Sequence, residues 1–495
     1  MTQEIDAATA HAWTALGGAR ESAEHVTYVT APGVLPARLP VRQLARASVG
    51  VCSLAAAELA ARRSGGGTPE VRVYEAAVGA AFVSERLLRI DGRSLSPFAP
   101  LSSFFPAADG WVRTHANYPH HRARLLSALG IPGGEDDDTL RERLARELRA
   151  RPARSIQDTV YAAGGLAVEV AAPGTEPGAE PGTEPAAERG TESGTRRRPL
   201  IESRRVGAGD GGGFPAGRGP RGGSGRRLSD GAGSLPAHGV RVLDLTRVIA
   251  GPVATRTLGL LGADVLRVDP PGLPEDPKAH ADTGFGKRST RLELGDPADR
   301  AVFGDLLASA DVVILGYRAG SLERYGLTPG ALLARYPGLI VAELNAWGWT
   351  GPWRERRGFD SLVQAATGIA LVQREADGPS PDGRPGTLPA QALDHSTGYL
   401  LAAAILRALT EREDDGAGRH LRLSLTGTAS WLTDGVRPEP EAADEGTEDP
   451  GAWLAETPSP YGRLRYVLPP VAYEGGPRDW PGPPSLWGTD AARWL

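Results

Sequence analysis

The stretch VRVLDLTRVIAGPVATRTLGLLGADVLRV (240–268) decides the fold class. Its two ends, VRVLDL (240–245) and DVLRV (264–268), are rich in β-branched and apolar residues, as buried strands are. Between them a short loop leads into TRTLGLLG (255–262), whose apolar spacing suits a helix. A strand–helix–strand unit of this kind typically joins two parallel strands. We therefore expect a parallel sheet to begin here.

The alternation of strands and helices continues along the second half. DPADRAVFGDLLASA (296–310) has apolar residues at helical spacing, with Asp296 as a candidate N-cap and Pro297 at the first helical position. DVVIL (311–315) and LIVAEL (339–344) follow as apolar strands. This order predicts a doubly wound, Rossmann-like parallel sheet, an α/β fold.

The first half has a different pattern. Residues 47–62 are an Ala-rich helix, and ADGWVRTH (108–115) is a strand that follows a turn. Residues 120–130, 139–150 and 155–165 form amphipathic helices. Short helices around a small sheet predict a smaller α+β domain.

Two low-complexity segments separate the halves. Residues 172–198 contain an acidic Pro/Gly repeat, and residues 205–233 are rich in Gly and Arg. Neither can bury enough apolar surface to offset the entropy lost on ordering, so we expect mobile linkers. The island RPLIESRRVG (198–207) between them could dock as a strand. The predicted parts are therefore 1–171, a linker at 172–233, and 234–495.

An internal repeat relates the two halves. Residues 45–73 and 393–423 both run from a polar turn with Gly, through an Ala/Leu helix that ends in Arg, across a Gly-containing turn and into a strand. Aligning Gly50 with Gly398 places Arg46 where Asp394 stands. The first copy would then lack the acid of the second.

Composition excludes several function classes. A net charge of −5 gives no electrostatic case for nucleic-acid binding, and the single Cys52 excludes an intramolecular disulfide. No signal peptide and no apolar run of membrane-spanning length is evident, which favours a cytoplasmic protein that binds no membrane. The nine histidines show no metal-ligand spacing, so we expect no metal site. The loop after the first strand lacks GxGxxG, which disfavours NAD binding.

Asp394 stands in LPAQALDHSTGYLLAAAILRAL (388–409), just before a nearly unbroken apolar run. It could be an ordinary helix N-cap. The helix behind it is apolar on every side, which indicates burial, and the positive end of the helix dipole favours the anion. An anionic, partly desolvated carboxylate can attack a carbonyl group. The two interpretations are compatible.

Taken together, these pieces resemble the class III CoA-transferase family (CaiB/BaiF). The matching stretches come in family order over about 200 residues of the second half, and the small domain of the first half also resembles the family, so that family pieces occur in swapped or partly duplicated order. The matching stretches of the second half are 240–272, GKRSTRLELGDPADR (286–300), ADVVILGYRAGSLERYGL (310–327), GWTGPWRERRGFDSLVQAATG (348–368) and LDHSTGYLLAAAILRAL (393–409). The resemblance implies an acyl-CoA:carboxylate CoA-transferase with Asp394 as the nucleophile, acting through an anhydride and an aspartyl-CoA thioester.

The resemblance also implies where coenzyme A is bound. Lys287 and Arg288 join this set as two adjacent cations that could meet phosphates. The implied positions are Ile249, Ala250, Lys287, Arg288, Leu292, Leu294, Gly316, Tyr317, Arg324, Arg357 and Phe359.

Two alternatives remain open at this stage. Phe359 stands where the racemase branch of the family has a histidine, and racemisation needs a proton donor and an acceptor. An acyl-CoA racemase or epimerase is therefore disfavoured. Apolar residues at Ile249, Gly316 and Phe359 also suit a catalytically degenerate CoA-binding protein. Family members form interlocked dimers, which implies a homodimer or a pseudo-dimer within one chain, with small-molecule acyl-CoA and carboxylate substrates.

Overall fold

The structure is a computed structural model, and it describes residues 5–94, 98–178, 198–205, 235–318, 320–374, 383–439 and 449–495. Most of both predicted linkers, 179–197 and 206–234, lies outside the described residues. The island between them does dock: β8 (Glu202–Arg205) pairs antiparallel with β14 (Arg419–Ser424).

The described residues of the second half, together with β8, form a seven-stranded sheet in the order β11-β10-β9-β12-β13-β14-β8. Every pair except β14–β8 is parallel, and the strand order reverses between β9 and β12, as in doubly wound folds. The predicted Rossmann-like α/β sheet is confirmed. Its other strands are β9 (Arg241–Leu245), β10 (Asp264–Asp269), β11 (Arg288–Arg291), β12 (Val312–Leu315) and β13 (Ile340–Asn345).

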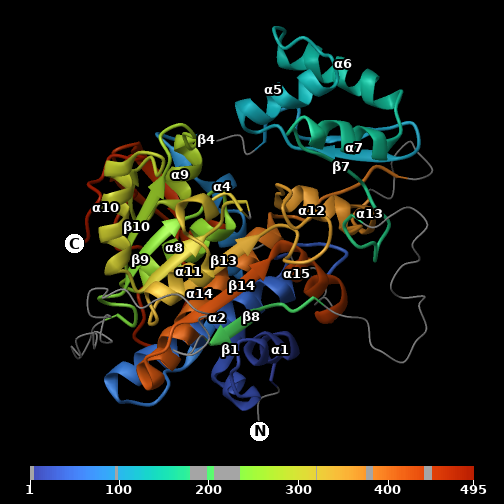
Figure 1. Cartoon of the computed structure of the whole chain (residues 1–495). Coiled ribbons are helices and arrows are strands. Elements are labelled where there is room, and N and C mark those ends of the chain that lie inside the picture. Colours follow the sequence, from blue (N-terminus) through green and yellow to red (C-terminus); the bar gives the residue numbers. More distant parts are fainter. Residues whose placement is uncertain are drawn as a thin grey trace.

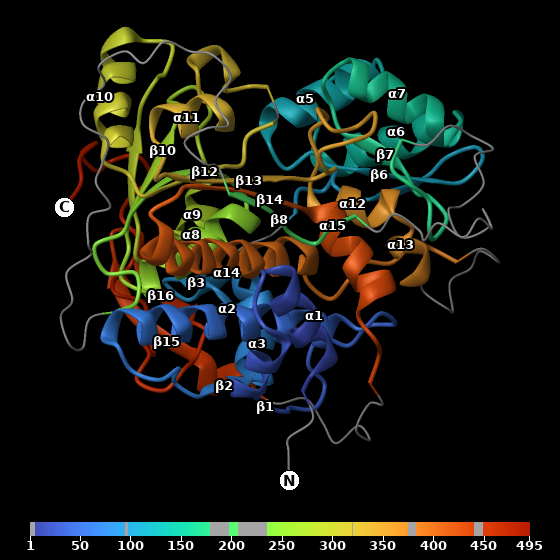
Figure 2. The ribbon, with the colours of Figure 1, turned by 60° about the horizontal axis from the view of Figure 1, so that its bottom comes forward.

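Helices cover both faces of this sheet (Figure 2). Because successive strand residues point to opposite faces, Leu243 packs into one apolar cluster and Val242 into another. The first cluster lies under α10 (Pro297–Ala308) and α11 (Pro329–Arg335), and the second under α8 (Ala250–Leu260) and α14 (Ala392–Asp415). Asp296 caps α10 as predicted, since its side chain accepts from the N–H groups of Ala298 and Asp299.

The smaller α+β domain is also present. Figure 1 shows it beside α12, with three antiparallel strands under three helices. Leu125, Leu140 and Ile156 from the helices share a core with Val112 from the sheet. Its elements are β5 (Phe104–Pro106), β6 (Trp111–Thr114), α5 (Pro119–Ala128), α6 (Asp137–Arg149), α7 (Ala153–Ala162) and β7 (Ala167–Glu169).

The predicted internal repeat has a structural counterpart. α2 (Val41–Ser64) and α14 have 24 residues each, end at a left-handed glycine (Gly65 and Gly416), and lead into a strand and a short helix. Asp394 is the third residue of α14 and Gln43 the third of α2, so the helix starts align Asp394 with Gln43, whereas the glycine match aligns it with Arg46. Either alignment leaves the first copy without a carboxylate.

α2 and α14 also pack against each other through their apolar residues (Figure 2). Among the described residues, α2 alone is long and apolar enough to cross a membrane, but 89% of its apolar window is buried inside the protein. Its composition therefore matches its place in a core.

The C-terminal segment returns to the sheet domain. A hairpin of β15 (Leu454–Ser459) and β16 (Gly462–Val467) pairs with β3 (Arg89–Ile90), and the N–H of Leu495 donates to Asp264 Oδ2 at 2.9 Å. The remaining elements are α1 (Ala7–Ala15), β1 (Val26–Val29), β2 (Val71–Tyr74), α3 (Glu75–Phe82), α4 (Ser84–Leu87), β4 (Arg93–Ser94), α9 (Pro277–Thr283), α12 (Asp360–Ala366), α13 (Ile369–Val372), α15 (Leu425–Ser430), a π-turn at Trp431–Gly435, and 3-10 turns at Arg20–His25, Glu323–Tyr325 and Pro450–Trp453.

Candidate active site

One interpretation of the sequence made Asp394 the N-cap of its helix, and the structure contradicts it. α14 begins at Ala392 after Gln391, which makes no side-chain capping bond. Asp394 lies within the first turn and is 7% exposed. It therefore sits at the buried mouth of the helix without satisfying the helix end.

Asp360 holds the start of this helix. Its Oδ2 accepts from the N–H of Asp394 at 2.9 Å, and its Oδ1 accepts from Gln364 Nε2. The Oε1 of Gln364 accepts in turn from the N–H of Leu388 at 2.9 Å. Asp360 and Gln364 of α12 thus fix the segment that carries Asp394.

The first half of the chain contributes a third acid. Glu85 Oε2 of α4 lies 3.6 Å from His395 Nε2, and the Phe82 ring stacks on the His395 ring with centroids 5.2 Å apart. His395 is 1% exposed. No local signal in the sequence points to Glu85, because it lies far from Asp394 along the chain.

Burial dominates the electrostatics of this site. Desolvation, followed by the charges of Asp360 and Glu85, raises the pKa of Asp394 well above its usual range. Burial likewise raises the pKa of Asp360 to about 6. The expectation that the helix dipole keeps Asp394 anionic is therefore wrong in direction, because burial and two like charges outweigh it. Asp394 has to lose a tightly held proton before it can act as a nucleophile.

Four predicted residues meet where the strand order reverses, which is the usual ligand crevice of such sheets. The N–H of Gly316, just after β12, donates to Leu245 O at the end of β9 at 3.1 Å, and Tyr317 OH donates to Asp269 Oδ1 at 3.5 Å. The loop after β9 also holds Val248 at φ 74°, a left-handed conformation that strains a β-branched residue. The four predicted residues are Ile249, Ala250, Gly316 and Tyr317.

Asp394 lies close to this crevice. A Cβ on Gly398 would come within 2.6 Å of Ala250 O, so α14 and α8 touch there. Residues four apart share a helix face, which puts Asp394 on the α8 side, one turn before Gly398. The predicted nucleophile and the predicted coenzyme A loop are thus brought together.

Phe359 connects the small domain to the site. Its ring stacks on His115 at 3.8 Å with an interplanar angle of 8°, and His121 meets it edge-on at 5.8 Å. Burial lowers the pKa of His115 well below its usual value and that of His121 to about 3, so both rings are neutral. The sequence did not single out either histidine as part of this site.

The cation pair does not lie as predicted. Lys287 Nζ is buried, 3.3 Å from Asp244 Oδ2 and 2.8 Å from Thr255 Oγ1, so its charge is used inside the fold. Arg288 pairs with Asp264 at 2.6 Å on the outer strand β11, away from the crevice. Neither is placed to meet a phosphate at the crevice, because both cations already have partners elsewhere.

Three further predicted positions lie apart from Asp394. The side chains of Leu292 and Leu294 are buried in the cluster under α10, so they serve the core. Arg324 is exposed on the turn Glu323–Tyr325, with its guanidinium 4.7 Å from the Tyr325 ring centre.

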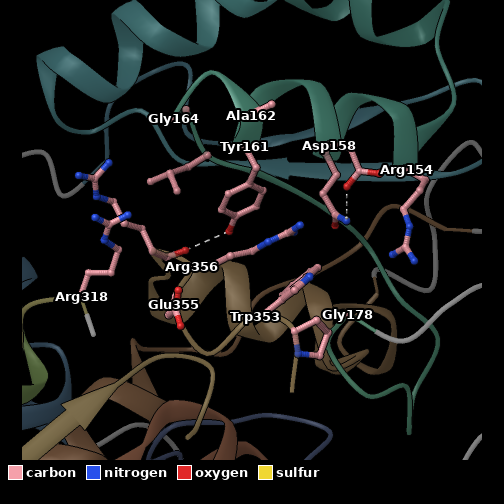
Figure 3. A pocket seen from close by; sticks show the side chains of 15 residues that line it. Arg154, Asp158, Tyr161, Ala162, Gly164, Gly178, Arg318, Trp353, Glu355 and Arg356 are labelled. Atoms are coloured by element: carbon pink, nitrogen blue, oxygen red, sulfur yellow. Dashed lines mark hydrogen bonds between the residues drawn. The ribbon is translucent and has the colours of Figure 1, made fainter. Parts of the chain in front are cut away.

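A cavity of about 610 Å³ lies between α7 and residues 352–357 (Figure 3). Tyr161 OH donates to Arg357 O across it at 3.0 Å, and the Arg356 guanidinium lies 4.8 Å from the Trp353 ring centre. Arg318 also lines it, so cationic and aromatic side chains face one space. Of the predicted residues, Arg357 lines this cavity and Asp394 does not. Across the described ranges, no three His, Cys, Asp or Glu side chains group to hold a metal ion.

Residues 238–458 match the sequence model of CoA-transferase family III. The "Probable fatty acyl-CoA transferase Rv3272" of Mycobacterium tuberculosis is 33% identical over 248 residues, which cover 45% of this chain and 62% of that protein. The "Succinyl-CoA--L-malate CoA-transferase beta subunit" of Chloroflexus aurantiacus is 33% identical over 246 residues, covering 47% and 59%. A crystal structure of a CAIB/BAIF family protein from Brucella suis is 28% identical, covers 46% of this chain and 65% of that one, and has a TM-score of 0.36. The chain thus spans about three fifths of the length of these relatives.

Proposed function

Because the chain belongs to CoA-transferase family III, we propose that it transfers coenzyme A from an acyl-CoA thioester to a carboxylate acceptor. One observation carries the proposal. Asp394, a buried carboxyl on α14, lies one turn from the contact of Gly398 with Ala250 in the crevice of a doubly wound sheet. This position brings a nucleophile to the place where such folds bind ligands.

The chemistry uses Asp394 as a covalent carrier. Its carboxylate attacks the thioester carbonyl, the C–S bond breaks, and the CoA thiolate leaves a mixed anhydride. The thiolate then attacks the Asp394 carbonyl, which releases the donor acid and forms an aspartyl-CoA thioester. The acceptor carboxylate attacks that thioester to form a second anhydride and free the thiolate. Attack of the thiolate on the acceptor carbonyl gives the new acyl-CoA and restores the Asp394 carboxylate.

The cavity beside α7 supports coenzyme A as the substrate. Guanidinium groups of Arg318, Arg356 and Arg357 suit phosphates, and the rings of Tyr161 and Trp353 suit an adenine. Arg357 is also one of the positions that the family resemblance implied. We therefore place the nucleotide end of coenzyme A here and its thioester near Asp394.

The arrangement of the chain supports a pseudo-dimer. α2 and α14 pack together as two similar helices of one chain, and Glu85 of the first half reaches His395. A single chain would then form one catalytic site, at Asp394. The named relatives act on fatty acyl-CoA or on succinyl-CoA and malate, and we propose a substrate pair of that class, an acyl-CoA and a small carboxylic acid.

Incubation with a panel of acyl-CoA donors and carboxylates, followed by mass spectrometry of the CoA species, tests the proposal. Wild-type protein forms new acyl-CoA, and borohydride traps an adduct at Asp394. Asp394→Ala loses both while still binding acyl-CoA. Asp414→Asn, at the exposed far end of the same helix, retains both. Binding without transfer in the wild type would instead identify a degenerate CoA-binding protein, and α-proton exchange in deuterated water would identify a racemase.

A further inference from the structure

Arg113 is a buried cation that the chemistry described so far does not use. It is 6% exposed, and the part of the chain that the structure describes offers it no ion pair and leaves its Nε without a hydrogen-bond partner. Its guanidinium lies 4.9 Å from the Phe104 ring centre and 5.6 Å from that of Phe98. Burying a guanidinium without an anion is costly, so a partner from outside the chain would stabilise it.

The register of the small sheet shows which way Arg113 faces. Val112 belongs to the core under the small domain's helices, whereas Phe104 and Val168, the cross-strand neighbours of Arg113, pack into the main core. Alternation along β6 therefore turns Arg113 and His115 toward the main body. His115 confirms this direction, because it stacks on Phe359.

The element that Arg113 faces is the start of α12. Phe359 immediately precedes Asp360, whose Oδ2 holds the N–H of Asp394. The charge of Asp360 acts on Arg113, opposing burial and Arg384, and the net effect lowers the pKa of Arg113 to about 10. Ser361, the second residue of α12, is 2% exposed and has an Oγ without a partner in the described structure. A buried cation thus faces the start of α12, which carries a free hydroxyl next to Asp360.

We propose that Arg113, with Ser361 as a second donor, binds the carboxylate of the acceptor acid. A guanidinium presents two parallel N–H groups that match the two oxygens of a carboxylate, and its charge holds the acid as the anion needed for attack. Arg113 would then orient the acceptor toward the Asp394 thioester and exclude neutral acceptors. The inference rests on the proposed function and names the substrate group that Arg113 recognises.

Binding of carboxylates to the full chain tests this without turnover. Calorimetric titration with succinate, oxalate and acetate is compared between wild type, Arg113→Gln and Arg113→Lys. We expect Arg113→Gln to weaken binding about 10- to 100-fold, as loss of a charged hydrogen bond does, and Arg113→Lys to weaken it less. In steady state, the KM for the acceptor rises and the KM for acyl-CoA does not. Arg141→Gln is the matched control, because Arg141 is half-buried and lies over Phe105, on the other face of the same sheet.

The outcomes separate this inference from the proposed transfer. If the wild type binds none of the three acids, or if Arg113→Gln binds them equally well, the assignment of Arg113 is wrong, even where transfer is observed. A rise in the KM for acyl-CoA alone would show that Arg113 binds the donor, and would also overturn its assignment to the acceptor. Carboxylate binding that depends on Arg113 without any new acyl-CoA would refute the proposed transfer and leave this site intact. Should Arg113→Gln fail to fold, Arg113→Lys decides by the same two measurements.

Discussion

The main-chain N–H of Asp394 donates to Oδ2 of Asp360 at 2.9 Å, so two acids that begin different helices are held side by side. In an apolar site the charge of one carboxylate opposes the ionisation of the other, and the pair titrates together. Burial and the charges of Asp360 and Glu85 raise the pKa of Asp394. A nucleophilic Asp394 has to be ionised, so the rate should rise with pH until Asp394 is an anion.

Replacing Asp360 with asparagine tests this coupling. Asp360→Asn keeps an oxygen to accept the N–H of Asp394 but removes the negative charge that raises its pKa. We expect the acid limb of the kcat/KM profile, measured from about pH 5 to 9, to move to lower pH. Asp414→Asn, exposed at the other end of α14, should leave the profile unchanged. An acid limb that stays in place would mean that Asp360 does not control the ionisation of the nucleophile.

Glu85 should act in the same direction from the other half of the chain. Glu85→Gln removes a second negative charge near Asp394, so the acid limb again moves to lower pH. Glu58→Gln is a matched control, because Glu58 pairs with Arg407. Arg407 lies on α14, thirteen residues or about 20 Å beyond Asp394. A shift in both variants would show a general effect of charge on α14 rather than a contact of Glu85 with the site.

The features that could be predicted from the sequence are those that neighbouring residues determine. Alternating apolar segments gave the strands of the sheet, and Asp296 with Pro297 gave the start of α10, because strand burial and helix capping depend on neighbouring residues. The interpretation of Asp394 as an N-cap was wrong, because the start of α14 is held by Asp360, which lies far back in the chain. The adjacent cations Lys287 and Arg288 suggested a phosphate site, but in the fold the Lys287 ammonium pairs with Asp244. Glu85, His115 and Arg113 reach the site only through tertiary packing, which no spacing in the sequence reveals.

The contact of α14 with α8 depends on Gly398. A Cβ there would lie 2.6 Å from Ala250 O and 2.9 Å from Val253 Cβ, so both helices would have to move. We expect Gly398→Ala to lower the free energy of unfolding by about 1–3 kcal/mol and to reduce kcat, because Asp394 moves with its helix. Gly304→Ala is the control: it lies in α10 with nothing within 4 Å of its Cβ, and should raise stability by about 0.5–1 kcal/mol. Chemical denaturation measures both, and a Gly398→Ala protein of unchanged stability would contradict the close approach.

Lys287→Met distinguishes a structural cation from a phosphate ligand. Its ammonium offsets the burial of Asp244, whose pKa would otherwise rise, and holds that pKa below its usual value. Without it Asp244 is a buried anion that has lost its paired cation and keeps only the weaker effect of Arg267 and two threonine hydrogen bonds, so we expect a loss of about 3–5 kcal/mol of unfolding free energy near pH 7. Loss of the Lys287 charge raises the folded pKa of Asp244 relative to wild type, so the wild type gains stability over the variant as pH rises through the acid range. The difference in unfolding free energy between the variant and the wild type should therefore be small near pH 4 and reach its full size near pH 7. Acyl-CoA affinity should be unchanged in the folded variant, whereas Arg357→Gln, in the exposed lining of the cavity beside α7, should weaken it with stability within about 0.5 kcal/mol of wild type. Weakened acyl-CoA binding in a fully stable Lys287→Met protein would restore Lys287 as a ligand contact.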